Sequence, residues 1–161
     1  SSVLKGRDDI VSVAHTHTVA GMALSAVEGE LRPVHQKALR FYKHLSYHPY
    51  EGIADDPEEC ERLQRDLGEN DAMVLENHGL LTCGRSIRST WALLYSLEKC
   101  CQVQIALESS GGEVIELSDN IKESTYHLFE RALKSNNEGS KLDGWESSLR
   151  LLAKEDPSFL H

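Results

Sequence analysis

The sequence has no hydrophobic run long enough to cross a membrane and no visible signal peptide. Its lysine and arginine residues do not gather into a basic stripe, and its net charge is −9 at pH 7. A surface of that charge repels nucleic-acid phosphates and anionic lipid headgroups. We therefore expect a cytoplasmic protein that binds neither nucleic acid nor membrane.

Cysteine is scarce, and its spacing does not suggest a disulfide framework. The four cysteines, none of which forms a C-x-x-C pair, are Cys60, Cys83, Cys100 and Cys101. Reduced thiols are the simpler interpretation. Cys83 has two readings, a metal ligand or a small buried residue on a strand, and we favour the second.

Repeats and low-complexity tracts are also absent. With 161 residues and 40% hydrophobic content, the chain can form one core but not two, which predicts a single domain over residues 1–161. Strand-like segments alternate with helical segments. There are enough helices to cover both faces of a sheet, so we predict an α/β protein with α/β/α layers.

Hydrophobic periodicity and helix-boundary residues predict the individual elements. Strands are expected at 10–13, 72–76 and 80–83, and residues 113–117 are expected to form a short strand or an extended piece. Helices are expected at 19–27, 33–45, 57–67, 87–109, 119–134 and 142–153, with a loop at 135–141. Ser86 is expected to cap the longest helix, and the buried face of that helix is expected to include Trp91, Leu94, Tyr95 and Ile105.

Two short segments carry most of the chemical information, the Ala-His-Thr-His-Thr of residues 14–18 and the Glu-Asn-His-Gly of residues 76–79. Each follows an apolar run that is typical of a short strand. Alternation along a strand puts His15 and His17 on one face, roughly 6 to 7 Å apart, where two imidazoles can converge on one cation. On a helix the same spacing would turn them about 200° apart.

A third imidazole comes from His78. Gly79 follows it at once and allows a turn or a close approach of the backbone to a ligand. Three neutral imidazoles suit Zn²⁺ and leave a coordination position open. The alternative is a hydrogen-bonded histidine pair at a strand end. We favour a metal site with His15, His17 and His78 as ligands, and Zn²⁺ or another divalent cation as the metal.

The remaining polar candidates each have two readings. By alternation Glu76 would share the face of His78, as a base or a partner of that ligand, or it would form a surface salt bridge. The spacing of His35, His44 and His48 does not match one helical face. Surface or partner-facing histidines are favoured there over a second metal site.

Three separated segments resemble the class II aldolase/adducin family between Asp8 and about Gly112. They read VAHTHTVAGMALSAVEGELRP, YHPYEGIADD and MVLENHGLLTCGRSIRSTWALLYSLEKCCQVQIA. The resemblance implies a three-layer α/β/α sandwich with a mainly antiparallel central sheet. It also implies a catalytic Zn²⁺ held by His15, His17 and His78, and a homotetramer in which a neighbouring subunit completes each site.

The family's sugar-phosphate aldolases also carry a glutamate base and a phosphate-binding loop upstream of the His-X-His strand. The fourteen residues before His15 contain no glutamate. Either the N-terminal part of the domain is missing from this chain, or the protein has lost this chemistry. We favour the first, with the catalytic base upstream of Ser1.

The activity that the resemblance implies is that of a zinc-dependent lyase in carbohydrate metabolism. Such an enzyme acts on a small hydroxy-carbonyl compound, often a sugar phosphate, through an enediolate or enolate in aldol cleavage, epimerisation or decarboxylation. The +2 charge of a tris-histidine centre favours a small anionic substrate. Two alternatives stay open, a non-catalytic adducin-like interaction module and a zinc hydrolase.

Overall fold

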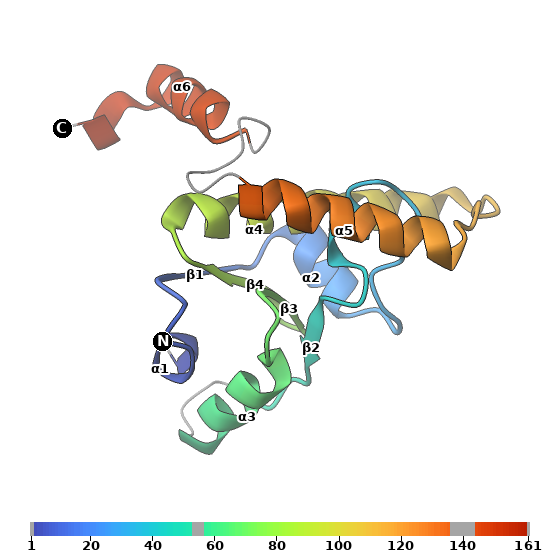
Figure 1. Ribbon diagram of the computed structural model, residues 1–161, viewed down its shortest axis with the longest axis horizontal. Coiled ribbons are helices and arrows are strands. Elements are labelled where there is room, and N and C mark those ends of the chain that lie inside the picture. Colours follow the sequence, from blue (N-terminus) through green and yellow to red (C-terminus); the bar gives the residue numbers. More distant parts are fainter. Residues whose placement is uncertain (1, 53–56, 136–143, 161) are drawn as a thin grey trace.

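One four-stranded sheet forms the centre of the protein (Figure 1). The computed structural model describes residues 2–52, 57–135 and 144–160. The strands are β1 (Ser12–Thr16), β2 (Ser46–His48), β3 (Ala72–Leu75) and β4 (Gly79–Gly84), in the spatial order β1-β4-β3-β2. Strand β4 pairs antiparallel with β1 and β3, whereas β2 pairs parallel with β3. The mainly antiparallel sheet is confirmed, with one parallel pair that makes it mixed.

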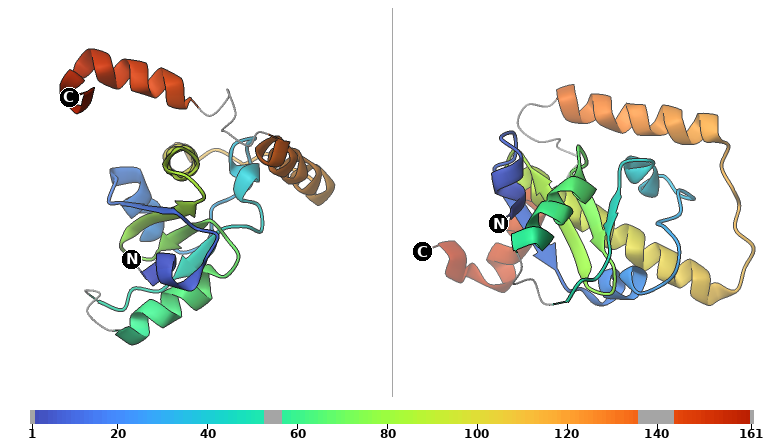
Figure 2. Two further views of the ribbon diagram at one scale, coloured as in Figure 1. Left: turned by 60° about the vertical axis from the view of Figure 1, so that its left-hand side comes forward. Right: turned by 90° about the horizontal axis from the view of Figure 1, so that it is seen from below.

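Helices cover both faces of this sheet (Figures 1 and 2). Helices α2 (Val19–Ser25) and α4 (Ile87–Ser110) lie on one face, and α1 (Ser2–Gly6) and α3 (Pro57–Leu67) on the other. The predicted three-layer α/β/α arrangement is confirmed. The α5 helix (Asp119–Ser135) packs on the 3₁₀ helix η1 (Ala38–Phe41).

The C-terminal elements are α6 (Trp145–Glu155) and the 3₁₀ helix η2 (Pro157–Leu160). The α6 helix reaches the start of α4, where Arg88 pairs with Glu146 at 3.2 Å and Trp91 meets Trp145 edge to face. No residue of α6 is buried. None of the helices in the described part of the chain is long and apolar enough to span a membrane.

Alternation along the strands divides the core into two parts. Leu80 of β4 points towards α4 and packs with Leu97, and neither is exposed to solvent. Met73 of β3 points the other way and packs with Leu67 of α3. Since both faces are covered, β3 and β4 are buried along their whole length and appear in the sequence as continuous apolar runs.

For most helices, the bounds predicted from helix-boundary residues lie within two residues of the observed bounds. The α3 helix begins at Pro57 and is followed by Gly68 with a φ of 54°. The α4 helix begins after Ser86, whose side chain accepts a hydrogen bond from the Ser89 amide at 3.1 Å. It ends at Ser110, one residue beyond the predicted end, and Gly111 follows in the left-handed conformation.

One predicted element is wrong, and a second does not form the strand that was one of its two interpretations. Residues 33–45 contain only the short η1, because Lys43 takes a left-handed φ of 60° and the chain must extend into β2. Residues 113–117 form no strand in the described sheet. Ile115 is 86% exposed, so this segment has no apolar face for a sheet to bury.

The short elements α1 and β2 were not predicted. They have five and three residues, too few to show a hydrophobic period. Apart from Ser135, the loop predicted at 135–141 lies outside the described residues. So do residues 142–143 of the last predicted helix.

The buried face of α4 agrees with the prediction in part, since Leu94 packs against the core but the aromatic residues do not form the buried face. Tyr95 is 45% exposed and Trp91 stacks on it, with ring centroids 5.3 Å apart. The buried positions are mainly small residues, among them Ala92, Cys100 and Cys101. Small side chains let the helix lie close to the sheet and to α2, which leaves the aromatic rings outside.

Candidate metal centre

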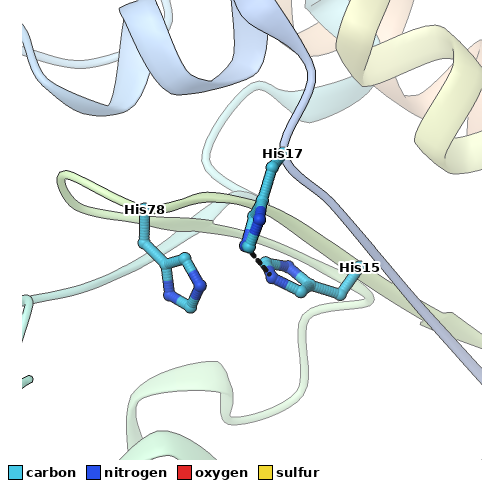
Figure 3. A group of neighbouring side chains, drawn as sticks. All are labelled: His15, His17 and His78. Carbon is cyan, nitrogen blue, oxygen red and sulfur yellow. Dashed lines mark hydrogen bonds between the residues drawn. The ribbon is translucent and has the colours of Figure 1, made fainter. Parts of the chain in front are cut away.

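Three histidines meet where β1 comes alongside the β3–β4 turn (Figure 3). His15 lies on β1, His17 just past its end, and His78 in the turn. Each offers one ring nitrogen, and these atoms all lie within 4.8 Å of one another. The structure thus brings together the three residues that the sequence predicted as ligands.

The antiparallel register of β1 and β4 explains why the histidines meet. Thr16 pairs with Leu80, so His17 comes beside Gly79 at the start of β4. A Cβ atom on Gly79 would overlap the carbonyl oxygen of Thr16 and lie 3.3 Å from the His17 ring. The glycine after His78 is therefore required for the two strands to approach this closely.

A three-residue turn carries His78 into the cluster. Asn77 takes a left-handed φ of 54°, which asparagine tolerates better than most residues. Its amide donates to the carbonyl of Ser25 at 2.8 Å, and the amide of His78 donates to the carbonyl of Leu75 at 3.0 Å. Backbone hydrogen bonds to α2 and β3 thus hold the turn in place.

A hydrogen bond to the backbone orients the His15 ring. Its Nδ1 lies 2.9 Å from the carbonyl oxygen of Leu80, and because a carbonyl can only accept, Nδ1 carries the proton. The lone pair of neutral His15 is then on Nε2, which lies 2.7 Å from Nε2 of His17. Metal-binding histidines usually donate such a hydrogen bond from the ring nitrogen that does not bind the metal.

The environment of His78 favours its neutral imidazole. Burial lowers the pKa of His78, and the neighbouring rings of His15 and His17 lower it further. A neutral ring keeps the lone pair that a metal ion needs. His15 and His17 are exposed and His78 is half-buried, so a small molecule can reach the cluster from solvent.

The donor set and spacing fit a divalent cation. Two nitrogens bound to one Zn²⁺ at about 2.0 to 2.1 Å lie at most about 4.2 Å apart, so small ring movements would suffice. Three imidazoles leave a fourth position for another ligand. Among the described residues, no carboxylate or thiol joins the cluster.

Cys83 and Glu76 do not belong to the cluster. Cys83 is 1% exposed in the core beneath α3, where burial raises its pKa to about 12. The buried-residue reading of Cys83 is confirmed. Glu76 is exposed, and no ion pair involves its side chain within the described ranges. Its role as a base stays a prediction.

The prediction of a surface or partner-facing position is wrong for His48. This residue is 3% exposed, and its Nδ1 lies 2.7 Å from Oδ2 of Asp66 on α3. His44 is exposed and stacks on Tyr126, with ring centroids 4.0 Å apart, as a surface histidine can. No second histidine cluster is found among the residues that the structure describes. Alternation on β2 would have signalled the burial of His48, but the strand itself was not recognised.

Known proteins share both the sequence pattern and the fold. The family model of the class II aldolase and adducin N-terminal domain matches residues 1–105. A class 2 aldolase-like protein of Pseudomonas aeruginosa is 38% identical over 159 residues, which are 99% of this chain and 61% of that protein. Alpha-adducin of Rattus norvegicus is 35% identical over 114 residues, covering 70% of this chain and 15% of adducin.

Solved structures indicate the same family as the sequence comparisons. An aldolase II superfamily protein from Pseudomonas syringae superposes with a TM-score of 0.86 and 35% identity, over 96% of this chain and 61% of that one. The L-fuculose 1-phosphate aldolase of Glaciozyma antarctica gives a TM-score of 0.67 and 28% identity, over 79% and 47%. The chain thus spans 61% of the length of the bacterial relatives that match it over nearly all its residues.

Proposed function

This chain belongs to the class II aldolase and adducin family, and from that premise we propose that it is the metal-binding core of a lyase. The observation that carries the proposal is the convergence of three imidazoles, one of them oriented by a backbone carbonyl. His15, His17 and His78 would hold a divalent cation. We propose zinc, because three nitrogen donors with an open position suit it.

A bound divalent cation would polarise a carbonyl oxygen and stabilise the negative charge that develops beside it. The chain's own residues set the conditions for this chemistry. Neutral imidazole ligands do not reduce the charge of the bound cation, so its full positive charge can attract an anion. The exposed rings of His15 and His17 leave the site accessible. The substrate that we propose is a small anionic hydroxy-carbonyl compound such as a sugar phosphate. It would undergo aldol cleavage, epimerisation or decarboxylation through an enediolate or enolate.

Metal binding is tested separately from turnover. We expect the chain to bind one zinc ion per molecule, measured by competition with a chromophoric chelator. His78→Ala should weaken binding by at least about 100-fold, since two remaining ligands define no stable geometry. His127→Ala is the matched control, because His127 lies exposed on α5. Wild-type protein that binds no zinc would overturn the proposal.

Turnover is tested on the natural protein in its full length, loaded with zinc. The candidate substrates are phosphorylated ketoses and 3-keto acids. Activity that is lost on chelation and in the His78→Ala variant would support the lyase. Turnover of esters or amides alone would indicate a zinc hydrolase instead.

A non-catalytic interaction module is the second candidate. The match to alpha-adducin over 70% of this chain favours it. Zinc bound at full occupancy, with no turnover of any compound tested, would support the module over the enzyme.

We also propose that the protein is a cytoplasmic homotetramer with the metal site near a subunit boundary. The exposed apolar residues Val19, Met22 and Tyr50 are 82%, 41% and 54% accessible and would be covered by such contacts. Sedimentation at micromolar concentration checks the assembly. A monomer under those conditions contradicts it.

A further inference from the structure

A small pocket lies beside the three-histidine cluster, between the ends of β2 and β3 and the α3 helix. Its volume is about 60 Å³. Glu76 and His78 line it on the side of the cluster, Glu59 and Leu63 line it from α3, and His48 is its most buried polar residue. A water molecule needs only about 10 to 15 Å³ of such space, so the pocket has room for a small polar group.

The pocket and the cluster lie on the same side of the sheet. His15 pairs directly with Leu81 across β1 and β4, and paired residues share a face. Leu81 and Leu75 belong to the core beneath α3, and Leu75 also lines the pocket. A compound held at the cluster therefore meets the pocket without passing around the sheet.

The second ring nitrogen of His48 is buried and unpaired in the part of the chain that the structure describes. Its Nδ1 is 2.7 Å from Oδ2 of Asp66, and because a carboxylate accepts, Nδ1 carries the proton. In the neutral ring the lone pair is then on Nε2. The Nε2 atom is buried and has no hydrogen-bond partner within the described residues. Buried acceptors are nearly always paired in folded proteins, so this atom is suited to a donor from a bound molecule.

Most of the other polar residues that line the pocket are glutamates, whose carboxylates accept hydrogen bonds. Glu59 and Glu76 contribute carboxylates to the lining. A third carboxylate, that of Glu51, is held by the guanidinium of Arg62, whose Nε lies 2.9 and 2.8 Å from its two oxygens. Such a lining attracts O–H donors and repels phosphate or carboxylate groups.

We propose that this pocket binds a hydroxyl group of the compound held at the three-histidine cluster, with the O–H group donating to Nε2 of His48. The proposal rests on the proposed function and adds to it the class of substrate. The anionic end of the compound faces the cluster, and its hydroxylated end enters the pocket. Asp66 is a positioning residue, because it acts by keeping the proton of His48 on Nδ1.

The first test uses metal-free protein and glycerol as the probe. Long-range ¹H–¹⁵N NMR should show the Nδ1–H tautomer of His48, with an Nε2 signal that shifts as glycerol is added. The hydroxyl-free analogue 1,2-dimethoxyethane should leave the signal unchanged. In Asp66→Asn the amide can donate to Nδ1, so the tautomer should reverse and the response to glycerol disappear. An Nε2–H tautomer in the wild type, or a signal indifferent to glycerol, overturns the proposal.

The second test uses zinc-loaded protein and a matched pair of anions, 3-hydroxypropionate and propionate. Calorimetry gives the affinity ratio of the two. We expect His48→Phe to reduce the preference for the hydroxylated anion about fivefold, the contribution of one net hydrogen bond, with propionate binding and zinc content unchanged. His48→Gln keeps an acceptor and should restore part of the preference, and His127→Phe should keep all of it. An unchanged ratio in His48→Phe overturns the proposal.

The two tests separate failure of the pocket from failure of the metal site. If zinc does not bind, the proposed function fails, and the glycerol titration of metal-free protein still decides the role of His48. If zinc binds and the ratio is unchanged, only the pocket is disproved. Since His48 is buried, circular dichroism must show that His48→Phe folds. If it does not, the glycerol titration of the wild type and the ratio in His48→Gln decide.

Discussion

At the scale of single residues, Gly79 is the position where an added side chain would do most harm to the histidine cluster. A Cβ atom there would overlap the backbone of Thr16. We expect Gly79→Ala to lower the free energy of unfolding by about 1 to 3 kcal/mol, the usual cost of overpacking. Zinc affinity should fall with it, because Thr16 and His17 must move. Urea denaturation measures the first effect and chelator competition the second.

Gly29→Ala is the matched control for this prediction. Gly29 also has a positive φ, of 108°, but nothing lies within 4 Å of a Cβ atom built on it. Its substitution reports the backbone strain without the steric overlap. Equal losses of stability in the two variants would show that the approach of Thr16 to Gly79 does not matter.

The residues of the cluster could be predicted because the information is local. The two-residue spacing of His15 and His17 needs only a strand to bring the rings together, and Gly79 signals the close approach beside His78. His48 could not be predicted in the same way. Its burial follows from the unrecognised strand β2, and its partner Asp66 lies 18 positions away on a helix whose packing the sequence does not show.

At the scale of elements, the start of α4 is set by one side chain. The hydroxyl of Ser86 accepts from the amide of Ser89, and the Ser89 hydroxyl accepts from the Ser86 amide in return. Ser86→Ala should lower the free energy of unfolding by about 1 kcal/mol in a urea titration. Ser109→Ala near the other end of α4 removes only an exposed bond to Ile105 and should have a smaller effect. Equal effects would argue against the cap.

The link between α1 and β1 depends on a charge pair that responds to acid. Arg7 donates to Asp9 at 2.8 Å and to the carbonyl of Asn70 at 2.7 Å, which ties this segment to the start of β3. The hydrogen bond from Arg7 lowers the pKa of Asp9 to about 2. A lowered carboxyl pKa adds stability above its unfolded value near 4, and that stability is lost as the pH falls towards 2.

Asp9→Asn should therefore reduce the urea midpoint at pH 7. The difference in midpoint between the variant and the wild type should become smaller between pH 4 and pH 3. The measurement is a set of urea titrations of both proteins at pH 7, 4 and 3. Asp119→Asn is a suitable comparison, since Asp119 is a far more exposed carboxylate, 86% accessible, and pairs with Lys122 three residues away. A deficit of the same size at every pH would show that Asp9 does not act through its charge.

Elements with strong local signals were predicted, and those that depend on neighbours were not. Pro57, Gly68, Ser86 and Gly111 mark helix ends through their own conformational preferences. Strand β2 has only three residues and exists because it pairs with β3, which lies more than twenty positions further along the chain. No local pattern carries that information.

At the scale of the whole molecule, a bound metal should stabilise the fold. Free zinc at 100 times its dissociation constant should add about 2.7 kcal/mol to the free energy of unfolding, if only the folded chain binds it. Differential scanning calorimetry with and without zinc measures the rise in Tm. The shift should vanish in His78→Ala and persist in His127→Ala. A shift that survives in His78→Ala would mean that zinc binds elsewhere.

The position of the cluster in the chain also determines when it forms during folding. His15 is 65 residues from Leu80, whose carbonyl orients it, so the site exists only after β1 has closed a long loop onto β4. Contacts between such distant residues form slowly, and the three ligands stay far apart until β1 has paired with β4. Zinc should therefore leave the rate of folding almost unchanged and lower the rate of unfolding. Loss of the metal would show itself first as a shorter lifetime of the native state.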